Sequence, residues 1–144
     1  MLEILTRICD GEGTEKDLTN LTDLAHNVKA TSLCGLGQTA PNPVLSTMRY
    51  FKDEYLAHIN EKRCAAKSCK ELIAYHVEPD KCISCALCLK ACSSDAIEGG
   101  KKGQKAVILN DKCIRCGACI EKCTKQQAIV IVDRYAKADG EVGS

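Results

Sequence analysis

The chain has 144 residues, the length of one domain or of two small ones. An aromatic content of 3% and the absence of tryptophan exclude a core built mainly on bulky aromatic side chains. The formal net charge of +1, from 20 basic and 19 acidic residues, gives no indication of a nucleic-acid partner.

Twelve cysteines in a chain of this length require an explanation. The N-terminal sequence MLEILTRIC lacks the basic region and the apolar run of a secretory signal peptide, so we expect a cytoplasmic protein. In a reducing cytosol, cysteines at this density indicate bound metal rather than disulfides. The longest wholly apolar run, residues 128–132, is far shorter than the roughly 20 residues of a membrane span, and we expect no direct membrane insertion.

The first 62 residues are predicted to form helices. Apolar side chains recur at helical spacing over residues 2–9 and again over residues 42–59. Between them, Thr14 followed three residues later by Asp17 matches a capping box, which predicts a second helix extending to about residue 28. The first helix begins at the first residue without a cap, which favours a piece of a longer protein.

The second half of the sequence contains an internal duplication. Residues 80–97, DKCISCALCLKACSSDAI, recur as residues 111–129, DKCIRCGACIEKCTKQQAI. We expect a turn over residues 98–105 and strands over residues 106–109 and 129–132. Two copies are too few for a solenoid, which needs at least about three repeats.

Each copy carries the spacing C-x2-C-x2-C-x3-C, in which three cysteines bind one [4Fe-4S] cluster and the fourth binds the other cluster. The expected ligands are Cys82, Cys85, Cys88 and Cys123 for the first cluster, and Cys113, Cys116, Cys119 and Cys92 for the second. A pair of zinc sites is the alternative, but it leaves the third cysteine of each triplet without a role. Over residues 75–133 the chain resembles bacterial two-cluster ferredoxins, although Ser93 and Thr124 replace the proline that usually follows the fourth cysteine.

The chemistry available to such clusters is one-electron transfer, and neither repeat contains an obvious general base or nucleophile. Each oxidised cluster with four thiolates carries a charge of about −2, so two clusters change the formal net charge from +1 to about −3. This net charge favours a basic surface on the partner. The lysines at positions 101, 102 and 105 are interpreted as a solvated hairpin turn.

One cysteine, Cys34, stands alone in the loop TSLCGLGQTAPNPV. The segments MLEILTRICDGEGTEKDL and TSLCGLGQTAPNPVLSTMRYFKDEY resemble the C-terminal helical domain of the NADH-binding flavoprotein subunit of complex I. The resemblance implies that Cys34 is the fourth ligand of a further [4Fe-4S] cluster, with three ligands upstream of Met1. In this sequence Cys34 is therefore expected to be an orphan thiol, and the alternative is a small apolar side chain in a loop.

The combined order of segments resembles the NADH-binding subunit of soluble, electron-bifurcating NAD(P)-linked hydrogenases and related dehydrogenases. This resemblance implies an upstream flavin and nicotinamide site, and it implies partners such as the flavoprotein body and iron-sulfur or hydrogenase subunits. We expect an α+β chain with a truncated helical domain (1–62), a metal-binding linker (63–79), and a two-cluster ferredoxin domain with a polar C-terminal tail (80–144). No G-x-G-x-x-G sequence follows a predicted strand, so no nicotinamide site is expected in this chain.

The predicted function is electron relay between a flavin module and a partner redox protein, as part of an NADH dehydrogenase or NAD-linked hydrogenase subunit. The chain alone is expected to carry electrons without oxidising NADH. The main alternative is a free-standing two-cluster ferredoxin with a helical docking extension. A further alternative is a structural module with zinc and clusters but without redox turnover.

A second group of metal ligands is predicted at the junction of the two halves, in HINEKRCAAKSCKELIAYH. His58, Cys64, Cys69 and His76 supply two thiolates and two imidazoles, which zinc accepts in tetrahedral structural sites. The alternative is that both cysteines are free thiols and that the histidines are surface or capping residues. A structural metal would stabilise a chain with so few aromatic side chains.

Overall fold

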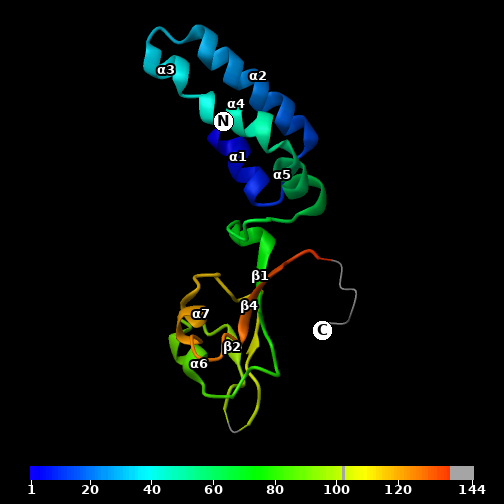
Figure 1. Ribbon diagram of the computed structural model, residues 1–144, viewed down its shortest axis with the longest axis vertical. Coiled ribbons are helices and arrows are strands. Elements are labelled where there is room, and N and C mark those ends of the chain that lie inside the picture. Colours follow the sequence, from blue (N-terminus) through cyan, green and yellow to red (C-terminus); the bar gives the residue numbers. More distant parts are fainter. Residues whose placement is uncertain (102, 137–144) are drawn as a thin grey trace. The chain divides into compact units, whose positions relative to one another are not determined.

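The computed structural model describes residues 1–101 and 103–136 and has an α+β architecture (Figure 1). It divides into two compact units. Unit 1 contains Met1–Leu72 together with the described residues from Asp133 onward, and unit 2 contains Ile73–Val132. The boundary between the two units, at Leu72 and Ile73, falls within the predicted linker 63–79.

Unit 1 is helical. Its elements are α1 (Leu2–Cys9), α2 (Glu15–Thr31), α3 (Gly35–Thr39), α4 (Asn42–Tyr50), α5 (Lys52–Leu56), the π-helical turn η1 (Ala57–Glu61) and the 3-10 turn η2 (Lys70–Leu72). Within the described residues, no helix is both long and apolar enough to cross a membrane.

The predicted capping box at the start of α2 is confirmed. The backbone N–H of Thr14 donates to Asp17 Oδ2 at 2.9 Å, and the hydroxyl of Thr14 donates to the same oxygen at 2.9 Å. Arg7 of α1 forms an ion pair with the other carboxylate oxygen of Asp17. Asp17 is only 5% exposed, so these partners offset the cost of burying its charge, and they join α1 to α2.

The helix predicted over residues 42–59 is interrupted. Phe51 leaves the helical region with φ −129° and ψ 32°, and this change of direction separates α4 from α5. The loop around Cys34 also contains more structure than predicted, because Cys34 caps the short helix α3 and its sulfur accepts the N–H of Gly37 at 3.5 Å. Side-chain periodicity does not report a backbone break at a single residue, so the interruption could not be predicted from it.

The core of unit 1 brings together side chains from α1, α2 and η1. Ile8, Leu18 and Ile59 form its buried centre, and Ile4, Met48, Tyr55 and Leu56 pack around them. On α2, Asp17, Leu18, Leu21 and Ala25 are buried, which is the spacing of one helical face. Leu21 is fully buried, whereas Leu24 on the same helix is 38% exposed.

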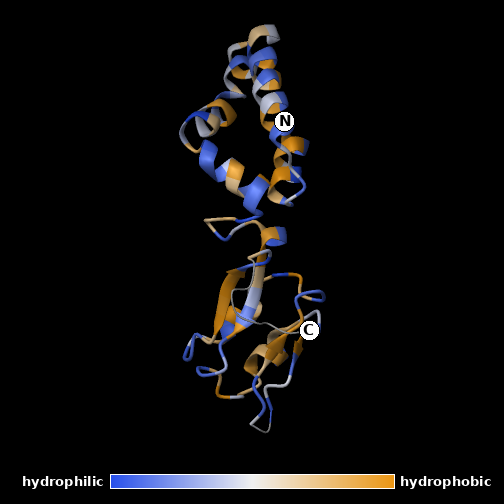
Figure 2. Cartoon of the chain, turned by 90° about the vertical axis from the view of Figure 1, so that its right-hand side faces the viewer, coloured by the Kyte–Doolittle hydropathy of each residue, from blue (hydrophilic) through white to orange (hydrophobic). Residues whose placement is uncertain are grey.

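Unit 2 contains two small sheets and two short helices. Its elements are β1 (Ile73–Val77), α6 (Leu87–Ala91), β2 (Ile97–Glu98), β3 (Val107–Ile108), α7 (Ala118–Lys122) and β4 (Ile129–Asp133). Strand β1 pairs with β4, and β2 pairs antiparallel with β3, with Ile97 opposite Ile108. Figure 2 shows that hydrophilic turns separate the hydrophobic strands of this unit.

Both strands predicted in this half are present as β3 and β4, whereas β1 and β2 were not predicted. Strand β2 has only two residues, too few for an alternating pattern to be recognised in the sequence. Strand β1 is buried at four of its five positions, so it lacks the alternation of a strand with one exposed face.

The different burial of Leu21 and Leu24 on α2 provides a test of the helical core. We expect Leu21→Ala to lower the free energy of unfolding of unit 1 by about 2–5 kcal/mol, because a fully buried leucine leaves a cavity when truncated. Leu24→Ala is the matched control and should cost less than about 1 kcal/mol. Urea unfolding monitored by far-ultraviolet circular dichroism measures both values, and equal losses would contradict the assigned packing of α2.

Candidate iron-sulfur and metal sites

Unit 2 contains two cavities lined by the repeated cysteines. One is lined by Cys82, Cys85, Cys88 and Cys123. The other is lined by Cys113, Cys116, Cys119 and Cys92. The structure therefore brings together the same two groups of four cysteines that were predicted from the spacing, each with three members from one repeat and one from the other.

The backbone around the cysteines follows the same unusual path in both repeats. Ser84 and Ala86 in the first repeat have φ of 56° and 58°, and the equivalent Arg115 and Gly117 in the second have φ of 53° and 83°. Positive φ in a residue other than glycine costs about 1–3 kcal/mol and persists where the surroundings require it. Turns of this kind direct backbone N–H groups into a concave anion site, so they suit the sulfurs of an iron-sulfur cluster.

Burial affects the thiols in these cavities unequally. It raises the pKa of Cys88, and burial together with the neighbouring Cys113 raises the pKa of Cys119 to about 11. At Cys92, burial raises the pKa, but hydrogen bonds from Ser94 and from the N–H of Ala96 outweigh it and leave the pKa lowered. Raised values mean that thiolates need a positive partner here, which the iron of a cluster supplies. The thiols and the backbone thus fit a [4Fe-4S] group at each cavity.

The two cavities differ in their other side chains. Lys122 and Gln126 line the cavity of Cys82, Cys85 and Cys88, whereas Tyr75 and Ser94 line the cavity of Cys113, Cys116 and Cys119. The hydroxyl of the buried Tyr75 donates to the backbone oxygen of Arg115 at 3.3 Å. Burial, and then the charges of the three cysteines of the second repeat, raises the pKa of Tyr75. Because this hydroxyl stays neutral, it holds the second cysteine loop without adding a charge.

Cys34 lies in unit 1, on the surface. Its side chain is exposed, and so are Leu33 and Leu36, at 102% and 83%. An exposed thiol between two exposed leucines at the start of α3 can contact a group that approaches from outside these residues.

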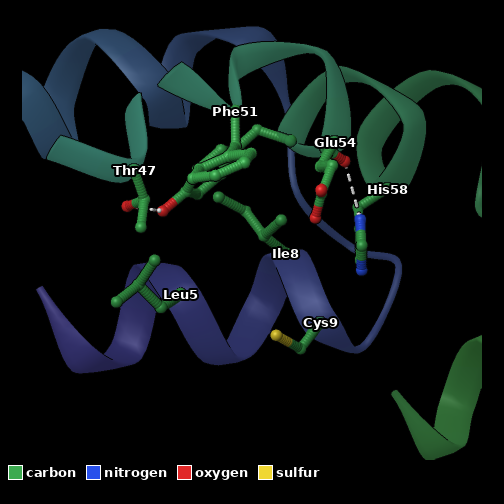
Figure 3. A pocket seen from close by; sticks show the side chains of 8 residues that line it. Leu5, Ile8, Cys9, Thr47, Phe51, Glu54 and His58 are labelled. Atoms are coloured by element: carbon green, nitrogen blue, oxygen red, sulfur yellow. Dashed lines mark hydrogen bonds between the residues drawn. The ribbon is translucent and has the colours of Figure 1, made fainter. Parts of the chain in front are cut away.

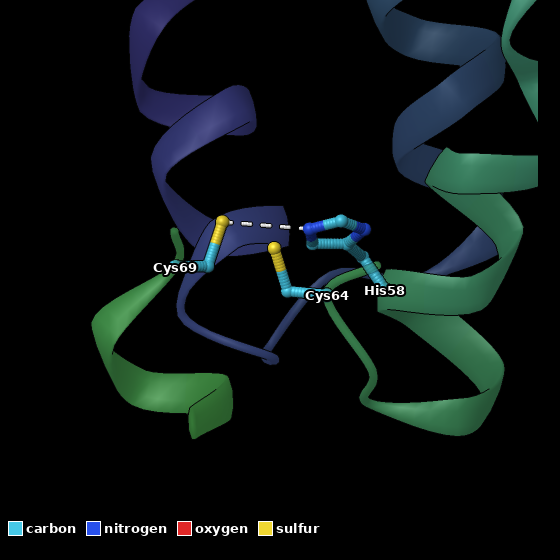
Figure 4. A group of neighbouring side chains, drawn as sticks. All are labelled: His58, Cys64 and Cys69. Carbon is cyan, nitrogen blue, oxygen red and sulfur yellow. Dashed lines mark hydrogen bonds between the residues drawn. The ribbon is translucent and has the colours of Figure 1, made fainter. Parts of the chain in front are cut away.

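A separate metal-ligand group lies in unit 1. Ligand atoms of His58, Cys64 and Cys69 all lie within 4.8 Å of one another, and Figure 4 shows the two thiols beside the imidazole. His58 Nε2 is 3.4 Å from Cys69 Sγ, while Nδ1 lies 2.7 Å from the backbone oxygen of Glu54. Because Nδ1 can reach a carbonyl oxygen only as a donor, the tautomer with free Nε2 is favoured. In metal-ligating histidines, the ring nitrogen that does not bind the metal typically donates to an oxygen in this way, as Nδ1 does here.

The pKa values of the two thiols of this group are shifted in opposite directions. Burial raises the pKa of Cys64. Hydrogen bonds from the backbone N–H groups of Cys69 and Ser68 and from the side chains of Cys69 and His58 outweigh burial and lower the pKa to about 7. Burial, followed by the neighbouring Cys64 and Cys9, raises the pKa of Cys69 to about 12. Without a metal, the pair therefore holds a single thiolate near neutral pH, and a divalent cation would favour the second.

Cys9, the last residue of α1, lies near this group of three and was not predicted as a ligand from the sequence. The Cys9 thiol is a neighbour of Cys69, and its charge contributes to the raised pKa of Cys69. Cys9 and His58 also line one end of a cavity of about 360 Å³ between α1 and the α4–η1 segment, whose other walls include Leu5, Ile8 and Phe51 (Figure 3). At helical spacing Cys9 is indistinguishable from the apolar residues of α1, which concealed its role. His76, a predicted ligand, is not in the group: it lies on β1 in unit 2, with its side chain exposed.

Comparisons with known proteins agree with this organisation. Residues 1–58 match the family described as the NADH-ubiquinone oxidoreductase-F iron-sulfur binding region, and residues 74–124 match the 4Fe-4S dicluster domain. The chain thus joins an oxidoreductase-F iron-sulfur region to a 4Fe-4S dicluster domain. The expected resemblance to the C-terminal part of NADH-binding subunits is thereby confirmed.

The relatives are subunits of larger enzymes. The chain is 49% identical over 102 residues to the NADP-reducing hydrogenase subunit HndC of Solidesulfovibrio fructosivorans, covering 71% of this chain and 21% of HndC. It is 38% identical over 64 residues to the F subunit of the NADH-quinone oxidoreductase of Streptomyces coelicolor, covering 44% and 14%. It is 40% identical over 45 residues to the NAD-reducing hydrogenase HoxS subunit alpha of Cupriavidus necator, covering 31% and 8%. The matched region thus spans about a fifth or less of each relative.

Proposed function

We propose that this chain transfers single electrons through two [4Fe-4S] clusters, as the iron-sulfur segment of an NADH- or NADPH-linked flavoprotein subunit. The observation that carries the proposal is the pair of cavities in unit 2, each lined by four cysteines drawn from both repeats. The dicluster domain match and the similarity to HndC support it. The described lining residues of both cavities include no histidine or carboxylate that would suit proton transfer instead.

In this proposal, Cys82, Cys85, Cys88 and Cys123 bind the first cluster, and Cys113, Cys116, Cys119 and Cys92 bind the second. The clusters supply one-electron chemistry when bound. The protein orients the thiolates, presents backbone N–H groups from the left-handed turns, and excludes water with the apolar side chains between the cysteines. Because each cavity uses a cysteine of the other repeat, binding of either cluster fixes α6 and α7 together.

Cys34 is proposed as one ligand of a further [4Fe-4S] cluster, whose other ligands come from outside these 144 residues. Its exposed thiol and the match of residues 1–58 to an oxidoreductase-F iron-sulfur region support this role. The proposed partners are a flavin-containing module and iron-sulfur or hydrogenase subunits, and the proposed compartment is the cytoplasm. A free-standing two-cluster ferredoxin with a helical extension remains the alternative. Binding of the helical unit to a flavoprotein would favour the relay. If the helical unit does not bind a flavoprotein, the free carrier would be favoured.

The ligand assignment predicts the metal content of the 144-residue chain. After anaerobic reconstitution, we expect about eight iron atoms per chain, because eight cysteines form two complete groups of four. Iron and sulfide analysis measures the content, and Cys34→Ser should leave it unchanged. A value near twelve would show that Cys34 also holds a cluster within this chain.

The proposed role also predicts what the chain cannot do alone. A hydride from NADH must be split into single electrons at a flavin, which an iron-sulfur cluster does not do. We therefore expect no NADH-dependent dye reduction by the purified, flavin-free chain, whereas dithionite should reduce it reversibly. Absorbance at the dye band measures NADH-dependent reduction, and absorbance at the cluster bands measures reduction by dithionite. Dye reduction with NADH alone would refute the assignment.

We also propose a zinc site in unit 1, formed by His58, Cys64 and Cys69 with Cys9 as the fourth ligand. The group of His58, Cys64 and Cys69 within 4.8 Å and the orientation of His58 by Glu54 support the first three ligands. The effect of the neighbouring Cys9 on the pKa of Cys69 supports Cys9 as the fourth. Three sulfurs and one nitrogen form a common tetrahedral ligand set for structural zinc. The π-helical turn η1 carries His58, and such turns frequently occur at functional sites. The site would tie the end of α1 to the segment between η1 and η2.

Zinc content tests this site. We expect about one zinc per wild-type chain isolated without chelator, and loss of that zinc in the Cys64→Ser/Cys69→Ser double variant with the iron content intact. Cys9→Ser should weaken zinc binding by at least about tenfold, as expected for loss of a ligand. His76→Gln is the matched control and should retain the metal. Mass spectrometry of metals measures all four proteins, and a wild-type chain without zinc would end the proposal.

A further inference from the structure

A lysine-bearing turn lies directly beside the first cysteine loop. The turn joins β2 to β3, and its side chain Lys105 donates from Nζ to the backbone oxygen of Cys82 at 2.5 Å. Gly99 fixes the path of this turn, because its φ is 72° and a Cβ there would lie 2.3 Å from the backbone oxygen of Lys105. Lys101 is exposed in the same turn. The turn therefore holds positive charge next to the cavity of Cys82, Cys85 and Cys88.

A further cation comes from the other repeat. Lys122, the last residue of α7, is adjacent to Cys123 in the sequence and lines the same cavity. Its side chain is exposed, so its charge is available to a molecule that approaches from solvent. Two separate segments of unit 2 thus place lysines around one cavity.

The surface between these lysines is apolar. Ile83 and Leu87 line the cavity and are 61% and 49% exposed, and Cys85 between them is also exposed. An exposed ligand sulfur with apolar neighbours is where a redox partner can approach a cluster closely. Apolar contact surrounded by charge is the usual composition of a specific protein interface.

The second cavity has different surroundings. It also reaches the surface, at Ile114, which is 57% exposed, and at the exposed Cys116. Its lining among the described residues contains no lysine or arginine, and the carboxylate of Asp95 acts electrostatically on Cys92. Of the two cavities, the first is therefore the one whose described lining carries an exposed positive charge.

We propose that the surface formed by Ile83, Cys85 and Leu87 with Lys101, Lys105 and Lys122 is the docking surface for an acidic redox protein. The inference rests on the proposed electron-transfer function and adds the partner's charge and the cluster through which one electron passes. The formal charge of the cluster-loaded chain, about −3, favours a basic partner instead. However, charges are screened over about 8–10 Å in physiological salt, so the local lysines outweigh the net charge at contact.

The test compares two variants of equal charge. The first replaces Lys101, Lys105 and Lys122 with glutamine, and the matched control replaces the exposed Lys16, Lys52 and Lys112. The probes are a strongly acidic bacterial two-cluster ferredoxin and basic cytochrome c. Calorimetry of the oxidised proteins measures binding without electron transfer, at low and high salt. Stopped-flow mixing of the dithionite-reduced chain with each oxidised probe then measures the rate of one-electron transfer.

We expect the wild-type chain to bind the acidic ferredoxin with an affinity that falls steeply with salt. The first variant should lose at least tenfold in affinity and rate, and the control should lose less than twofold. A Lys101→Gln/Lys122→Gln double variant keeps the contact between Lys105 and Cys82 and should show an intermediate loss with an unchanged iron content. Equal losses in the two triple variants, or tighter binding of cytochrome c than of the acidic ferredoxin at low salt, would overturn the docking surface. A chain that dithionite cannot reduce would instead overturn the electron-transfer function itself.

Discussion

The exchange of one cysteine between two repeats is the constraint on which unit 2 depends. Cys92 of the first repeat lies in the cavity of the second, and Cys123 of the second lies in the cavity of the first. Neither repeat can complete its cavity alone. The sheets are too small to hold the unit by themselves, since β2 and β3 contribute two residues each. The buried core is correspondingly modest: Tyr75 is its largest side chain, Cys119 belongs to it, and five of the other repeat cysteines pack against it partly buried.

This arrangement explains how a chain with few aromatic residues maintains a defined fold. The left-handed turns at Ser84, Ala86 and Arg115 store backbone strain, and raised pKa values at Cys88 and Cys119 oppose thiolate formation in the buried cavities. Both costs are offset when a positively charged metal group occupies the cavity. Folding and cluster binding are therefore expected to be coupled, as they are in other small metal-binding domains.

Unit 1 maintains its fold by different interactions. An ion pair between the half-buried Arg7 and the buried Asp17 joins its first two helices. His58 of η1 lies beside the thiols of Cys64 and Cys69 in the segment that follows η1. The two metal-ligand groups are chemically distinct. Four sulfurs around each cavity of unit 2 suit an iron-sulfur cluster. Two sulfurs and one imidazole in unit 1, with Cys9 as the proposed further ligand, suit a redox-inactive ion. On the proposed assignments, the chain combines two sites for electron transfer with one structural metal site.

The sequence alone determined the two groups of four cysteines, the capping box of α2 and the resemblance of both halves to known proteins. These features depend on residue type and short spacing, which a linear sequence displays directly. Only the tertiary structure brought Cys9 near Cys69, left His76 outside the group of three, and brought Lys105 and Lys122 to the surroundings of one cavity. Those positions are 60 residues apart for the thiols and 17 for the lysines, and no local pattern encodes the contact. These contacts depend on tertiary packing, because side chains distant in sequence meet only after the helices and hairpins have formed.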